Sequence, residues 1–171
     1  LIEHFTASFG QGIAMSPLST ARALSALANE GVLVTPHIAQ TIEYESGGST
    51  DVSPTESSRR VISPESAETI TRMLVTVVDE ALKGGDVKLE RYSIAAKTGT
   101  AQIPKANEAG YYDDRFLHSF FGYFPAYEPR FLVFLYTVEP HGVRYASETL
   151  TEPFMETTRY LIQYYDITPD R

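Results

Sequence analysis

Apolar positions recur at helical spacing in two segments of the first half of the chain. Both segments open on a Ser-Pro pair and end before glycine. Serine suits a helix N-cap, and proline suits the first helical position because the N–H that it lacks has no partner there. The pattern therefore predicts helices over residues 17–28 and 64–81. Their apolar faces comprise Leu18, Ala21, Leu24, Leu27 and Ala28 in the first, and Ala67, Ile70, Leu74, Val77, Val78 and Ala81 in the second.

The second half of the chain changes to runs typical of β-strands. Residues 116–124 and 130–138 are two such runs, and the short turn-forming link PAYEP between them predicts a hairpin. A further strand is predicted over residues 93–104. The run 130–138 is apolar on both faces, so helices are expected to cover both sides of the sheet. A last helix is predicted from Pro153, with an apolar face formed by Phe154, Thr158, Leu161, Ile162 and Tyr165.

This order of elements predicts an α+β fold, in which an antiparallel β-sheet is flanked by helices on both faces. Two segments lack periodicity and are predicted to be loops. The first, about 45–62, is rich in Ser, Gly and Thr and is expected to be exposed and flexible. The second, KANEAGYYDDR over residues 105–115, is polar and aromatic and follows the strand 93–104.

Composition narrows the class of protein. The 171 residues are 43% hydrophobic and 21% charged, which is typical of a globular protein with a core of single-domain size. The net charge of −8 argues against nucleic acid or an anionic membrane surface as a general partner. The chain has no cysteine, no apolar run as long as a membrane span and no signal-peptide pattern. Because it lacks an initiator methionine, we expect it to be part of a longer protein.

One charged residue interrupts the small side chains of the strand predicted over 93–104. Lys97 lies in SIAAKTGTAQIP, where an unpaired buried ammonium would be costly to desolvate. On a strand, Lys97 and Gly99 share one face, and Thr98 and Thr100 share the other. Gly99 leaves room for a ligand backbone, and an edge strand of this kind can pair with an extended peptide. The hydroxyls and the ammonium would then be placed to bind a terminal carboxylate.

Other interpretations of these residues remain open at this point. KTGT alone is also compatible with an exposed lysine at a strand end, beside two β-favouring threonines. A phosphate-binding P-loop is excluded, because Ala96 stands where G-x-x-x-x-G-K-[ST] requires glycine. The four histidines show no metal-ligand spacing, so no metal site and no cofactor are expected. His118 is predicted to be a strand histidine with a hydrogen-bond partner, and Asp113-Asp114 to lie in a solvated loop.

Four stretches taken together carry more information than KTGT alone. They are FGQGIAMSPLSTARALSALANEG (9–31), TPHI (35–38), AAKTGTAQ (95–102) and HSFFGYFPAYEPRFLVFLYTVEP (118–140). K-T-G is the third motif of the serine penicillin-recognising enzymes. In this order, the four stretches resemble the class B penicillin-binding proteins, and they cover most of the chain.

The resemblance implies a β-lactamase/transpeptidase-like fold and a D,D-transpeptidase that cross-links peptidoglycan. A serine would attack the D-Ala-D-Ala bond of a donor stem peptide and pass the acyl group to an acceptor amine, a reaction that β-lactams intercept. By the same resemblance, Lys97 would take part in the proton network around the serine. Thr98 and Thr100 would hold the donor carboxylate, and the Thr100 N–H would supply half of an oxyanion hole. Gly99 would keep the strand surface clear.

The chain also departs from the pattern of these relatives. It contains neither S-x-x-K nor S-x-N. We therefore expect residues 1–171 to be the C-terminal portion of one transpeptidase domain, inactive alone, with the nucleophile upstream. Ala96 stands where relatives often have glycine, with little effect expected. Tyr111 and Tyr112, predicted in the loop after the motif strand, are candidates for the border of the substrate cleft.

The same motifs leave two alternatives. A serine β-lactamase or D,D-carboxypeptidase of this superfamily would use water as the acceptor, and a non-catalytic envelope-binding relative would lack S-x-x-K in the complete protein. The partners implied are D-Ala-D-Ala stem peptides, β-lactams and a glycosyltransferase in a cell-wall synthesis complex. The parent protein would be anchored at the extracytoplasmic face of the bacterial membrane, with a role in cell division or in cell shape that these motifs do not separate.

Overall fold

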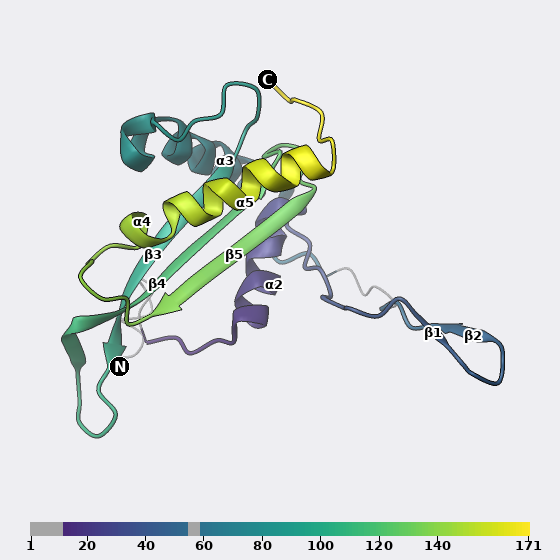
Figure 1. Ribbon diagram of the computed structural model, residues 1–171, viewed down its shortest axis with the longest axis horizontal. Coiled ribbons are helices and arrows are strands. Elements are labelled where there is room, and N and C mark those ends of the chain that lie inside the picture. Colours follow the sequence, from purple (N-terminus) through teal and green to yellow (C-terminus); the bar gives the residue numbers. More distant parts are fainter. Residues whose placement is uncertain (1–11, 55–58) are drawn as a thin grey trace.

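A three-stranded antiparallel sheet lies at the centre of the computed structural model, which describes residues 12–54 and 59–171 (Figure 1). Its strands are β3 (Ala95–Pro104), β4 (Tyr111–Phe124) and β5 (Phe131–Val138), in that spatial order. Each strand pairs with the next one along the chain, so β4 is central and β3 forms an edge of the described sheet. The predicted hairpin between residues 116 and 138 is confirmed.

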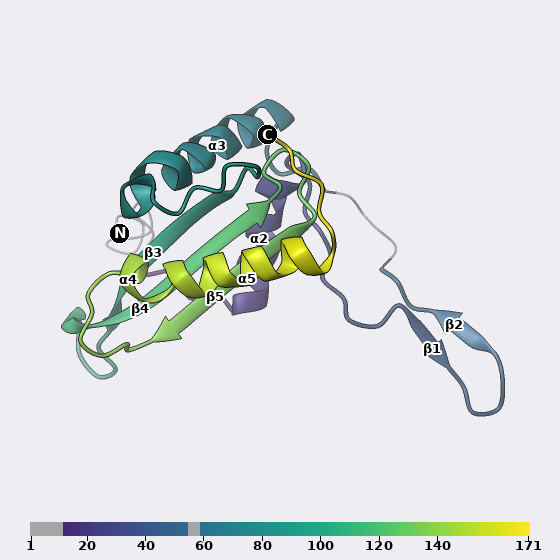
Figure 2. The same cartoon turned by 45° about the horizontal axis from the view of Figure 1, so that its top comes forward.

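Helices cover both faces of this sheet. In Figures 1 and 2, α5 (Thr151–Tyr164) lies across one face, and α2 (Pro17–Ala28) lies behind the other. The third helix, α3 (Pro64–Thr76), packs on the α2 side, where its residue Leu74 joins Ala95 and Tyr123 in one buried cluster. The α+β fold with helices on both faces is therefore confirmed.

Aromatic side chains of β4 fill the core on each side. On the α5 side, the rings of Phe120 and Phe154 stack with centroids 4.3 Å apart. On the α3 side, the Tyr123 hydroxyl lies 2.7 Å from Thr71 Oγ1. Burial raises the pKa of Tyr123 above its ordinary value, which keeps the phenol protonated for this hydrogen bond. The alternation of side chains along β4 thus joins two separate cores through one strand.

The helix starts follow the Ser-Pro prediction, and α2 also ends at Ala28 as predicted, while the second α-helix ends before residue 81. Ser16 and Ser63 each cap a helix, accepting a hydrogen bond from the N–H three residues on at 3.1 Å. Beyond α3 the backbone changes to a π-helical turn, η1 (Val77–Ala81), and then a 3₁₀ turn, η2 (Leu82–Gly85). Apolar spacing alone cannot separate these turns from an α-helix, because the spacing differs little over five residues.

Two helix predictions need correction. Leu18, expected on the buried face of α2, is 63% exposed, and Ala26 is the buried residue of that helix. The last helix begins at Thr151 instead of Pro153 and is preceded by a short helix, α4 (Ala146–Thr149). Four residues are too few to show a hydrophobic period, which explains why α4 escaped prediction.

Both predicted loops contain strand residues. Within about 45–62, β2 (Ser49–Asp51) pairs with β1 (Thr41–Glu43) in an exposed hairpin that extends away from the sheet (Figure 1); residues 55–58 lie outside the described residues. The predicted loop 105–115 ends earlier than expected, because β4 begins at Tyr111, opposite Pro104. Tyrosine favours strands, but the polar residues around Tyr111 and Tyr112 made the sequence pattern typical of a loop.

Candidate active site

The KTGT segment lies on β3 just where the strand leaves the core. Residues 93–96 are buried, whereas Lys97 is exposed. The buried end of the segment is fixed by the C-terminal part of the chain, because the Ser93 N–H donates to Asp170 Oδ1 at 2.7 Å and the Ser93 hydroxyl bonds to the same carboxylate. The strand therefore projects from a rigid anchor into a more open environment.

The two residues before KTGT establish which way its side chains point. Ala95 belongs to the core with Leu74 and Tyr123, and Ala96 belongs to the core with Phe120 and Phe154. Because side chains alternate along a strand, Lys97 and Gly99 follow Ala95 onto the α3 face. Thr98 and Thr100 follow Ala96 onto the α5 face. The sharing of faces predicted for these four residues is confirmed.

The Lys97 ammonium has one hydrogen-bond partner among the described residues, the main-chain carbonyl of Thr98 at 2.9 Å. No carboxylate in the described ranges forms a salt bridge with it. An ammonium has three donors. Lys97 can therefore bind further groups without first breaking an ion pair within this part of the chain.

Thr100 has a fixed donor beside its hydroxyl. The N–H of Ala146, the first residue of α4, donates to Thr100 Oγ1 at 2.9 Å. A hydroxyl has one hydrogen and two acceptor positions. With one acceptor position occupied, the hydroxyl of Thr100 remains able to donate its hydrogen to another group. Sequence reasoning had missed Ala146, which is 46 residues away in the chain.

Gly99 has a close neighbour within the sheet. A Cβ at this position would lie 2.6 Å from the hydroxyl of Ser119, the residue directly opposite on β4. The space on this side of Gly99 is therefore taken by Ser119, instead of being left clear for a ligand. Ser119 is half-buried and was missed by sequence reasoning.

β3 offers main-chain groups as well as side chains. It is hydrogen-bonded to β4 along one side only within the described sheet. An edge strand presents unpaired N–H and C=O groups that can bind an extended peptide. The arrangement combines an open strand edge, an exposed ammonium and an oriented hydroxyl within four residues of one strand.

The tyrosines expected at the cleft border lie on β4 instead of in a loop. Tyr111 pairs with Pro104, four positions beyond Thr100 on β3. Both tyrosines are half-buried, and the Arg115 guanidinium lies 4.2 Å from the centroid of the Tyr112 ring. The structure thus places them beyond the KTGT end of the edge strand.

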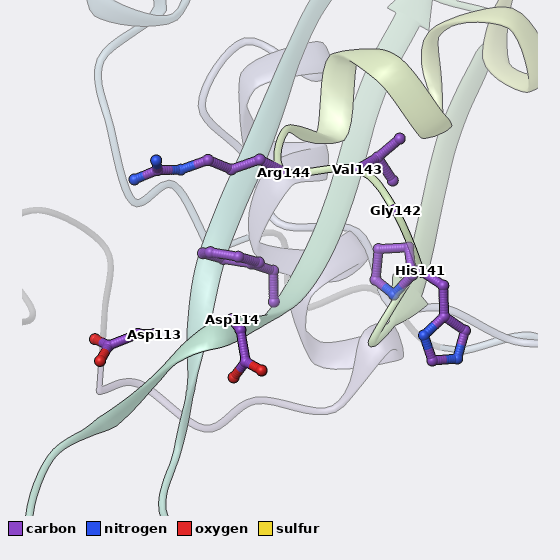
Figure 3. Close-up of a pocket in the computed structure, with 8 residues that line it drawn as sticks. Asp113, Asp114, His141, Gly142, Val143 and Arg144 are labelled. Atoms are coloured by element: carbon purple, nitrogen blue, oxygen red, sulfur yellow. The ribbon is translucent and has the colours of Figure 1, made fainter.

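A pocket of about 420 Å³ opens beside this end of the sheet. Figure 3 shows its residues coming from two segments, the start of β4 and the loop that follows β5. Asp113 and Asp114, expected in a solvated loop, are exposed strand residues that line it. The complete lining consists of Asp113, Asp114, Phe116, Pro140, His141, Gly142, Val143 and Arg144. Lys97, Thr98 and Thr100 are not among them, so the pocket neighbours the KTGT segment without containing it.

Two other kinds of feature are absent from the described ranges. No group of three or more His, Asp or Glu residues is arranged to hold a metal ion within residues 12–54 and 59–171. In the same part of the chain, no helix has both the length and the apolar character needed to cross a membrane.

The sequence is similar to that of known proteins. Residues 1–158 match the family model described as the penicillin binding protein transpeptidase domain. Stage V sporulation protein D of Bacillus subtilis is 32% identical over 155 residues, which cover 90% of this chain and 24% of that protein. Penicillin-binding protein PbpB of Mycolicibacterium smegmatis is 33% identical over 171 residues, covering 94% of this chain and 26% of that protein. The chain spans about a quarter of the length of these relatives.

Solved structures share the fold. Penicillin binding protein 3 from Mycobacterium tuberculosis, complexed with ampicillin, superimposes with a TM-score of 0.80 at 28% identity, covering 94% of this chain and 37% of that one. The transpeptidase domain of Burkholderia pseudomallei penicillin-binding protein 3 gives a TM-score of 0.72 at 26% identity, covering 99% of this chain and 48% of that one.

Proposed function

The chain belongs to the penicillin-binding protein transpeptidase family, and from this we propose that it forms the KTGT wall of a D,D-transpeptidase active site. The activity is that of the complete protein. A serine outside this chain attacks the carbonyl between the two D-Ala residues of a donor stem peptide. The C–N bond breaks, the terminal D-Ala leaves as a free amine, and an acceptor amine then displaces the serine from the ester.

Three of the four KTGT residues have a task in this reaction. Lys97 supplies positive charge and takes part in the proton transfers at the serine. Thr98 and Thr100 bind the carboxylate of the donor, for which the Thr100 hydroxyl is suited because its free hydrogen can be donated. The Thr100 N–H contributes to the oxyanion hole. Tyr111 and Tyr112 border the cleft that receives the peptide.

One observation carries the proposal. An exposed lysine, with no carboxylate partner in the described residues, lies on an edge strand three residues before a threonine whose hydroxyl already accepts a hydrogen bond. An extended peptide that pairs with this edge brings its terminal carboxylate to the same residues. The ampicillin complex of the related Mycobacterium tuberculosis protein supports the same ligand class, since β-lactams imitate D-Ala-D-Ala.

The setting of the complete protein follows from the same family. We place it at the extracytoplasmic face of the bacterial membrane, held by an anchor outside this chain and working with a glycosyltransferase. One relative is named a sporulation protein and another a probable peptidoglycan D,D-transpeptidase of Neisseria meningitidis. These names support an envelope role, and they are consistent with either division or shape maintenance.

The test is to follow the fate of the acyl group. The complete protein is incubated with a stem peptide ending in D-Ala-D-Ala and an acceptor amine, and the products are weighed by mass spectrometry. A transpeptidase releases D-Ala and yields the new amide in excess of the free acid. Free acid alone would instead indicate a carboxypeptidase, and hydrolysed penicillin a β-lactamase. No product and no penicillin adduct from a folded protein would indicate a non-catalytic relative.

A further inference from the structure

His118 is a buried titratable side chain that the proposed reaction does not use. It lies on β4 directly opposite Thr100, and it is fully buried. Opposite residues of an antiparallel pair place their side chains on the same face. The imidazole is therefore next to Thr100 on the α5 face, and the prediction that it has a hydrogen-bond partner is confirmed.

Both ring nitrogens of His118 hold the segment that contains α4. Nε2 lies 3.0 Å from the carbonyl oxygen of Arg144, and Nδ1 lies 2.9 Å from Thr149 Oγ1. A carbonyl can only accept, so Nε2 carries a hydrogen. Thr149 Oγ1 also lies 3.3 Å from the carbonyl oxygen of Ala146. The ring thus fixes this segment two residues before and three residues after Ala146.

Ala146 is the residue that orients Thr100. Its N–H donates to Thr100 Oγ1 at 2.9 Å, so the hydroxyl hydrogen of Thr100 must point away from Ala146. A hydroxyl held in this way is an oriented donor for an anion and loses little freedom when the anion binds. If the α4 segment moved, the hydroxyl would be free to turn.

We propose that His118 is a positioning residue that orients the Thr100 hydroxyl through Ala146 for the carboxylate of the substrate. The inference rests on the proposed function for its ligand, since the carboxylate is that of the donor peptide or of a β-lactam. The structure itself contains the hydrogen bonds that carry the inference. His118 contacts Arg144 and Thr149, and Ala146 donates to Thr100, without any ligand.

The first test needs no activity. Amide hydrogen exchange is measured at Ala146 in the complete protein, with His118→Ala compared with wild type. Exchange at Ala146 is expected to rise about tenfold or more in His118→Ala, because the segment opens locally. Tyr123→Phe is the matched control, since it removes a buried hydrogen bond of the same strand on the opposite face and leaves α4 untouched. Unchanged exchange at Ala146 in folded His118→Ala overturns the inference.

The second test separates positioning from loss of stability. The acylation rate with penicillin is expected to fall about 10- to 100-fold in His118→Ala, as for loss of one oriented hydrogen bond to a charged group. In a Thr100→Val protein, adding His118→Ala is expected to change the rate no further, because His118 acts through Thr100. His118→Gln, which keeps a donor for the Arg144 carbonyl, restores part of the rate and serves if His118→Ala does not fold.

The two claims can fail separately. A wild-type protein that forms no penicillin adduct refutes the proposed function, while the exchange result at Ala146 still decides the role of His118. A protein that is acylated normally, and loses equal activity from His118→Ala with either Thr or Val at position 100, refutes the positioning role alone.

Discussion

At the scale of single residues, the KTGT segment combines one side chain that is free with one that is fixed. Lys97 is exposed and bonds only to a carbonyl among the described residues, whereas Thr100 is held by an N–H from α4. An ammonium that is not held in an ion pair can change position as protons are transferred. A hydroxyl held in one orientation favours a ligand whose acceptor atom lies in that direction. Substitutions of Lys97 and of Thr100 are therefore expected to affect the reaction in different ways.

Thr100 provides a prediction that distinguishes its hydroxyl from its shape. Thr100→Val keeps the branched shape but removes the partner of the Ala146 N–H and the hydroxyl that we propose donates to the substrate. We expect penicillin acylation to fall about 10- to 100-fold, the usual effect of losing a hydrogen bond to a charged group. Thr100→Ser keeps the hydroxyl and should stay within about threefold of wild type. Stopped-flow acylation rates check both, and equal losses in the two variants would contradict the role given to the hydroxyl.

At the scale of elements, β4 joins both cores and carries the residues that support KTGT. The Ser-Pro helix starts and the hairpin between β4 and β5 could be predicted, because each depends on local pattern. Lys97 and Thr100 could be named from the resemblance. Ser119 and Ala146 could not, since their contacts depend on strand register and on a four-residue helix that has no period. Local sequence patterns predict helices and strands. Contacts between residues of different elements can be identified only in the assembled fold.

Gly122 tests how closely β4 is packed. A Cβ there would lie 2.5 Å from Phe154 Cζ, 2.7 Å from Ala96 Cβ and 2.9 Å from the Ala95 carbonyl oxygen. Gly122→Ala is therefore expected to destabilise the domain by about 3 kcal/mol, because the buried neighbours cannot all move. Gly99→Ala is the matched control and should cost about 1 kcal/mol, since only the rotatable Ser119 hydroxyl is in the way. Urea unfolding compares the two, and equal costs would contradict this packing.

At the scale of the whole molecule, the last residues of the chain hold the start of the motif strand. Asp170 binds both the N–H and the hydroxyl of Ser93. Arg171 binds Asp79 through two nitrogens and also the Leu89 carbonyl, and the Asp79 carboxylate raises the pKa of Arg171 further above its ordinary value. The C-terminal end therefore connects η1 to the segment that leads into β3.

Asp170→Ala tests this connection. Ser93 is buried, so the variant leaves its N–H without its charged partner, and we expect a loss of about 2 kcal/mol in the free energy of unfolding. Asp86 is also an exposed aspartate and serves as the control. Asp86→Ala should change the free energy of unfolding by less than about 0.5 kcal/mol. Thermal and urea unfolding provide the values. A loss confined to the Asp86 variant, or none in either, would contradict the role of the C-terminal end.

The central claim is that this chain provides the lysine-bearing wall of a penicillin-binding site. The most direct measurement is the intact mass of the complete protein after exposure to penicillin, for wild type, Lys97→Ala and the exposed-lysine control Lys88→Ala. We predict one penicillin adduct in wild type and in Lys88→Ala, and acylation at least about 100-fold slower in Lys97→Ala with the fold retained. Acylation of Lys97→Ala at the wild-type rate, or a folded wild-type protein that forms no adduct, would contradict the account.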